Sequence, residues 1–194
     1  MKRTLFILIL SVLIVTGFGC NRQDGAKNGN AEIDREQILF DAKKSGLIMD
    51  ENEMLAMQDP ARLQAVSGTN PEDVSSYVIA DTEGWKSAAL ADVTGGGSFG
   101  LAFVNFEKGS FTLIAKMGNL PVPQDGFHYE GWLVQRGEDM RVVSVGEPRP
   151  KGEQYVNVFL SSVDLSDYNF YVLTLEPDDQ NTAPAEHVLE GGLR

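Results

Sequence analysis

Alternating apolar and polar positions run through most of the chain after residue 77. Between Phe111 and Met117 every second side chain is apolar, which is typical of a strand with one buried face. Such segments, separated by turn residues, predict strands at 77–81, 87–93, 99–106, 111–117, 129–136, 141–145, 155–161 and 170–175, with a further candidate at 187–189. About eight short strands at roughly 12-residue spacing predict a mainly β fold, an Ig-like antiparallel β-sandwich over residues 77–194.

A helical period precedes the predicted strands. Asp34 can cap a helix whose end is marked by Gly46, because glycine readily adopts the left-handed conformation that stops a helix. Asp50 and Glu53 have the spacing of a capping box at the start of a second helix. These signals predict a short helical hairpin at residues 33–59.

The N-terminus has the pattern of an export signal. Residues 1–20 combine a basic start, an apolar run too short to span a bilayer, and the pair Gly19 and Cys20. This ending resembles a bacterial lipoprotein signal, which implies that Cys20 is lipidated and anchors the protein to a bacterial membrane or cell surface, outside the cytoplasm. An ordinary secretory signal with an incidental cysteine is the alternative. Residues 21–32 predict a flexible polar tether, and residues 60–76 predict a linker after the helices.

The charge balance narrows the range of partners. The 194-residue chain has a formal net charge of −12 and 42% apolar residues, enough for the core of one domain. Such an acidic surface repels nucleic acid and anionic lipid headgroups, and it favours cationic partners. Cys20 is the only cysteine in the sequence, so no internal disulfide supports the fold.

The sequence contains no motif that identifies catalytic chemistry. Three glycines at 95–97 lie between predicted strands, whereas a phosphate-binding loop leads into a helix, so they predict a hairpin turn. His128 and His187 are far apart and have no second histidine or cysteine at ligand spacing, so no zinc site is expected. The serines lack a G-x-S-x-G elbow. We therefore predict a protein that is not an enzyme and carries no cofactor.

Two loops are candidates for contact with a ligand or partner, since loops held on a rigid scaffold usually carry function. The loop at residues 120–126 is stiff because its two prolines fix two φ angles. An acidic turn at residues 176–181 can hold a hard cation, or it is a solvated turn begun by Pro177. The candidate contact residues are Leu120, Pro121, Pro123, His128, Trp132, Glu176, Asp178 and Asp179.

Two blocks of sequence carry a resemblance to a known family. The first combines the stiff loop with the strand after it, in Asn119, Leu120, Pro121, Tyr129, Gly131 and Trp132. The second is the ending LTLEPDDQNTAPAEHVLEGG. In this order and spacing, the blocks resemble the C-terminal extracytoplasmic domain of anti-sigma-K-type factors, and the resemblance covers residues 98–192. It implies a sensing or interaction module without catalytic residues.

The chain differs from a full anti-sigma factor of this type. Such a factor has a cytoplasmic sigma-binding helical domain and a membrane span before its outer domain, and neither is expected here. A chain with one cysteine also cannot form an H-x-x-x-C-x-x-C zinc motif. Direct binding of a sigma factor is therefore not expected.

The leading hypothesis is a non-enzymatic, lipid-anchored, extracytoplasmic binding or sensor domain. Its expected partner is an envelope or membrane signalling protein, with a regulatory role as one option. Two alternatives remain open at this point: a structural cell-envelope lipoprotein that oligomerises through its helices, and a cation-dependent domain that uses the acidic turn.

Overall fold

The computed structural model describes residues 34–194, which form one compact unit, and the predicted signal, Cys20 and the tether lie outside the described residues. The predicted mainly β, antiparallel fold with short helices before it is confirmed. The strands are β1 (Lys86–Asp92), β2 (Phe99–Glu107), β3 (Ser110–Gly118), β4 (Phe127–Gln135), β5 (Arg141–Gly146), β6 (Arg149–Lys151), β7 (Gln154–Ser161), β8 (Phe170–Pro177) and β9 (Glu186–Gly192).

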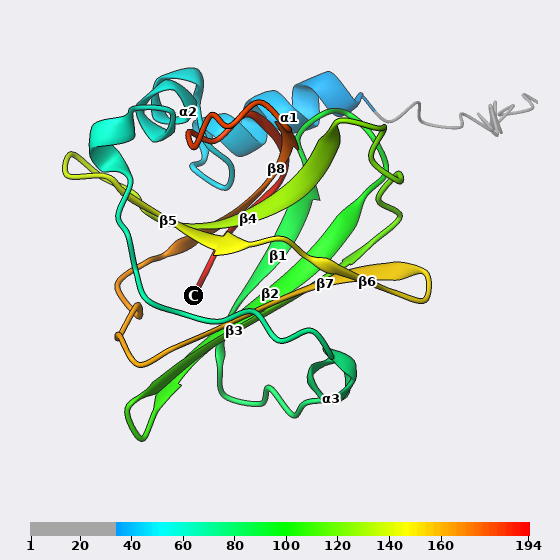
Figure 1. The fold of residues 1–194 in the computed structure, drawn as a ribbon. Helices are drawn as coiled ribbons and strands as arrows, with labels where there is room; N and C mark the ends of the chain where they lie inside the picture. Colours follow the sequence, from blue (N-terminus) through cyan, green and yellow to red (C-terminus); the bar gives the residue numbers. More distant parts are fainter. Residues whose placement is uncertain (1–33) are drawn as a thin grey trace, which may run out of the picture. The chain divides into compact units, whose positions relative to one another are not determined.

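The nine strands belong to one hydrogen-bonded sheet in the order β5-β4-β8-β9-β1-β2-β3-β7-β6. The sheet curls, so that its two halves face each other across a shared core as the layers of a sandwich do (Figure 1). The structure thus adds one feature to the predicted sandwich: its two layers are continuous through β9 and β1.

The inner face of the curl is the hydrophobic core. Phe111, Leu113 and Met117 of β3 are fully buried, in keeping with the period of two in the sequence. They belong to one cluster with Leu133 of β4 and Tyr171 of β8, which come from the opposite half of the sheet. Burial of these side chains supplies the main driving force that holds the halves together.

Amide side chains close the gap between β5 and β7, which are not hydrogen-bonded neighbours in the sheet. The buried Asn157 donates to the carbonyl of Gly146 at 2.9 Å. Asn70 donates to the carbonyl of Val145 at 2.6 Å and to that of Val158 at 2.7 Å. These bonds satisfy backbone groups that an open strand edge would leave unpaired.

Four short helices accompany the sheet: α1 (Arg35–Lys44), α2 (Glu51–Met57), the 3-10 helix η1 (Pro60–Arg62) and α3 (Ser75–Val78). The predicted caps of the first two are present. Asp34 accepts from the backbone N–H of Gln37, and Asp50 forms a capping box with Glu53. No helix within residues 34–194 is long and apolar enough to cross a membrane.

The segment around α1 and α2 covers the outer face of one half of the sheet. Met49 and Met57 are buried there against Trp132 of β4 and Phe170 of β8. In the other half, Val74 at the start of α3 packs on β7. Figure 1 shows α1 and α2 on one side of the molecule and α3 on the other.

Two local predictions are wrong. The predicted strand at 77–81 begins inside α3, because the carboxylate of Asp73 accepts from the backbone N–H of Ser75 and starts a helical turn. The predicted turn between β5 and β7 contains β6, a three-residue edge strand whose Pro150 leaves one backbone position without a donor.

Candidate functional site

Hydrogen bonds fix both ends of the loop at residues 120–126, which we call the proline-rich loop. The hydroxyl of Tyr129 donates to the carbonyl of Pro121 at 3.0 Å, and the backbone N–H of Asp178 donates to the carbonyl of Gly126 at 2.9 Å. Leu120 is half-buried and packs against the main core. The tip of the loop is exposed, and Val122 retains 82% of its accessible surface.

The acidic turn lies beside this loop. Phe127 pairs with Pro177 across β4 and β8. This pairing brings His128 Nδ1 within 2.7 Å of Asp178 Oδ1, on side chains that are partly open to solvent. The two candidate loops, about fifty residues apart in the sequence, therefore form one surface.

Asp179, in the same acidic turn, stabilises the conformation of the turn. Asp179 accepts from the backbone N–H of Asn181 at 2.8 Å, which is an ordinary Asx-turn bond. Within residues 34–194, no group of three or more histidine, cysteine, aspartate and glutamate side chains is arranged to hold a metal ion. The turn thus lacks the multidentate oxygen cage that a calcium ion requires.

Trp132 and Glu176, two predicted contact residues, are buried. The indole N–H of Trp132 donates to the hydroxyl of Thr174 at 2.8 Å, and this hydroxyl donates to the Glu176 carboxylate. The same carboxylate oxygen accepts from the backbone N–H of Ala185 at 2.9 Å. The chain of bonds joins β4, β8 and the loop before β9, so these side chains position the backbone and are not free for a partner.

Glu130 lies on the outer face of β4, between the buried chain of bonds and the open surface. Burial raises the pKa of its carboxyl, and the nearby carboxylates of Glu176 and Glu147 raise it further. A hydrogen bond from Ser144 and the proximity of His128 oppose this shift. The ionised carboxylate is therefore less favourable in the folded protein than in the unfolded chain.

We expect Glu130→Gln to stabilise the protein at pH 7, by on the order of 0.5 kcal/mol, the scale of a single surface substitution. A carboxyl with a raised folded pKa makes stability fall as pH rises through that pKa, because the folded state then loses the extra proton. Glutamine keeps an acceptor for Ser144 without the charge. Urea unfolding at pH 7 and pH 4 is the measurement, and the gain should shrink at pH 4. The exposed Glu138→Gln is the matched control.

A buried ionisable pair that the sequence did not reveal lies on β9. His187 Nδ1 is 2.6 Å from Glu190 Oε1, and both side chains are almost completely inaccessible. The other carboxylate oxygen of Glu190 accepts from the backbone N–H of Met49 at 2.6 Å. Glu190 therefore fastens the loop between α1 and α2 to the sheet. In the sequence this pair is only a histidine and a glutamate three positions apart in a short strand, which does not distinguish it from solvent-exposed residues.

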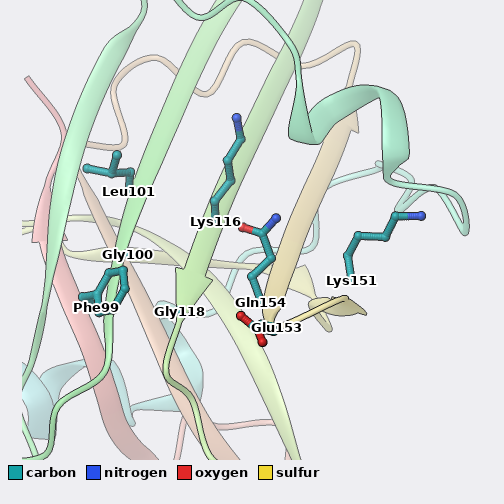
Figure 2. A pocket seen from close by; sticks show the side chains of 8 residues that line it. All are labelled: Phe99, Gly100, Leu101, Lys116, Gly118, Lys151, Glu153 and Gln154. Atoms are coloured by element: carbon teal, nitrogen blue, oxygen red, sulfur yellow. The ribbon is translucent and has the colours of Figure 1, made fainter.

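An open groove of about 500 Å³ lies on the outer face of the other half of the sheet. Figure 2 shows the residues that line it, which come from β2, β3, β6, the turn between β6 and β7, and the start of β7. They are Phe99, Gly100, Leu101, Lys116, Gly118, Lys151, Glu153 and Gln154. None of the predicted contact residues belongs to this groove.

Neither a protein-family model nor a curated protein nor a solved structure matches the chain.

Proposed function

We propose that the protein is a non-enzymatic, lipid-anchored binding or sensor domain that works outside the cytoplasm. In this proposal it corresponds to the outer half of an anti-sigma-K-type factor, without a sigma-binding or zinc-binding domain of its own. Its partner is an envelope or membrane signalling protein. The anchor is a lipid on Cys20, as the resemblance of residues 1–20 to a lipoprotein signal implies.

The observation that carries the binding role is an apolar side chain presented to solvent on a fixed loop. Val122 stands between Pro121 and Pro123, and both ends of the loop are hydrogen-bonded to the sheet or to the acidic turn. Because the loop that presents this valine is preorganised, forming a complex costs less conformational entropy. The neighbouring Asp178 adds a negative charge, which suits a partner with basic side chains.

The residues that carry the family resemblance support a division between buried scaffold residues and exposed contact loops. Trp132, Thr174 and Glu176, which come from both blocks, bond to one another inside the fold. Such residues maintain a scaffold, while the loops at its end remain free to vary with the partner. Scaffold residues shared with sensor domains, together with an exposed loop, favour binding over catalysis.

We expect Cys20→Ser to move the protein from the membrane fraction to the soluble fraction of cells that produce it. A lipid attached to the cysteine is the only anchor in the proposal, and serine cannot form the thioether that holds it. Fractionation followed by immunoblotting is the measurement. Thr16→Ser, a conservative change in the same segment, is the control and should stay with the membranes. A Cys20→Ser protein that still sediments with membranes would contradict the anchor.

Exposed apolar residues on the helices favour a second candidate, a structural envelope protein that oligomerises. Phe40 of α1 and Leu55 of α2 are 61% and 67% exposed. Sedimentation of the wild-type protein and of Phe40→Asp discriminates between the candidates. A dimer that the substitution dissociates would favour the structural role, whereas two monomeric proteins would favour the binding domain.

A further inference from the structure

The outer face of the curled sheet has two covered regions and one bare strip between them. The α1–α2 segment covers β4, β5 and β8, and the α3 segment covers β7. Between them, the outward positions of β1 and β2 carry Ala89, Ala91, Phe99 and Leu101, all of them exposed. Ala91 pairs with Phe99 and Ala89 with Leu101, so these apolar side chains are contiguous across the two strands.

The groove of Figure 2 is the side of this strip that faces β3 and β7. Phe99 is opposite Gly118 in the sheet, and a Cβ atom on Gly118 would lie 2.7 Å from the Phe99 ring. The missing side chain thus lets the ring lie against the backbone of β3 and leaves the neighbouring surface hollow. Phe99 remains 62% exposed and Leu101 49%, which is unusual for large apolar side chains that lie side by side.

Two lysines border the hollow, and the α3 segment positions both of them. Lys116 Nζ donates to the carbonyl of Val78 at 2.7 Å, and Lys151 Nζ donates to the hydroxyl of Ser75 at 2.6 Å. An ammonium group has three N–H donors, so one hydrogen bond leaves each lysine with donors for a further acceptor. The Lys116 ammonium also lies 5.8 Å from the centroid of the Phe103 ring. Glu153 is the one acidic side chain that lines the groove. Among the lining side chains the two lysines outnumber this one carboxylate, and Asp73, which accepts from the Ser75 hydroxyl, lies near Lys151 beside the groove.

We propose that the groove binds an amphipathic segment of a partner protein in which aspartate or glutamate side chains lie next to apolar ones. Its apolar side chains would pack on Phe99 and Leu101, and its carboxylates would bond to Lys116 and Lys151. Charge complementarity favours this occupant over a polyanion or an anionic membrane. Either of those would extend beyond the two lysines and be repelled by the acidic surface around the groove. This assignment rests on the proposed binding function and names a second, separate contact surface for it.

Site-specific photocrosslinking in intact cells tests the assignment. The full chain carries benzoylphenylalanine at Leu101 in the groove, at Val122 in the proline-rich loop, or at the exposed Val163, which belongs to neither surface. Each position is combined with the wild-type lysines or with Lys116→Glu and Lys151→Glu together. The control for net charge is the pair Lys86→Glu and Lys108→Glu, which lies outside the groove. Mass spectrometry then identifies the crosslinked segment of the partner.

The expected result is a discrete protein adduct at Leu101 that falls about tenfold in the groove double variant and persists in the charge control. The crosslinked segment should contain carboxylates beside apolar residues. If the double variant does not fold, Lys151→Glu alone replaces it, because the Lys151 ammonium bonds only to an exposed hydroxyl.

Other outcomes overturn the assignment. They are a Leu101 adduct no stronger than that at Val163, one that survives charge reversal, one with lipid, or one with a second copy of the chain. An adduct at Val122 without one at Leu101 rejects the groove and leaves the proposed binding function standing. No adduct at either position contradicts both.

Discussion

Glu190→Ala is expected to lower the free energy of unfolding by about 3–5 kcal/mol. The substitution removes the acceptor of two buried hydrogen bonds, from the backbone N–H of Met49 and from the ring of His187, and it leaves both groups without a partner. It also leaves a cavity, because the Glu190 side chain is completely buried. Urea unfolding followed by circular dichroism gives the loss of stability directly.

The position of the lost bonds gives a second readout. Glu190 connects the sheet to the loop that separates α1 from α2, so the amide of Met49 should exchange with solvent much faster in the variant, measured by hydrogen exchange. Glu186→Ala in the same strand is the matched control, because its side chain is exposed, and it should change stability by less than about 0.5 kcal/mol. Equal stability of the two variants would show that the buried carboxylate does not fasten the helical segment.

The buried contacts of Glu190 illustrate which features the sequence does not reveal. The alternation that predicted the strands is a local property, and the caps at Asp34 and Asp50 are local too, so strands and helices could be placed from the sequence. Burial of Glu190 depends on Met49, which is 141 residues away in the chain. A glutamate in a strand is ordinarily exposed, and only the long-range contact reverses that expectation.

The same distinction explains the errors at α3 and at the edge of the sheet. Aromatic and β-branched residues at 77–81 favour a strand. The hydrogen bond from the backbone N–H of Ser75 to the Asp73 carboxylate instead starts a helical turn, and packing of Val74 on β7 holds this turn in place. Closure of the gap between β5 and β7 depends on Asn70 and Asn157. Asn157 lies inside a predicted strand and Asn70 inside the predicted linker, and nothing in their local sequence indicates that the two side chains meet across this gap.

The candidate site was predicted in part. Proline content and acidic residues identified the two loops, and the pairing of β4 with β8 places His128 beside Asp178, which the sequence could not establish. The groove was missed because Phe99 and Leu101 alternate with small residues as an ordinary half-buried strand does. Their exposure follows only from how far the α1–α2 segment and the α3 segment extend over the outer face of the sheet.

Trp132→Ala decides whether this tryptophan, a predicted contact residue, instead maintains the fold. We expect a loss of about 3–5 kcal/mol in the free energy of unfolding, because the substitution leaves a large cavity under Met49 and Met57 and removes the donor to Thr174.

The milder Trp132→Phe separates the two contributions. Phenylalanine keeps most of the apolar volume but has no N–H, so its cost should be only about 0.5–1.5 kcal/mol, the value of one hydrogen bond. Trp85→Ala, at a half-buried position before β1, is the matched control and should cost less than Trp132→Ala. Urea unfolding followed by far-ultraviolet circular dichroism compares all three variants without relying on tryptophan emission. A Trp132→Ala protein as stable as the wild type would reverse the assignment, since a tryptophan that the fold does not need would again be a candidate for contact with a partner.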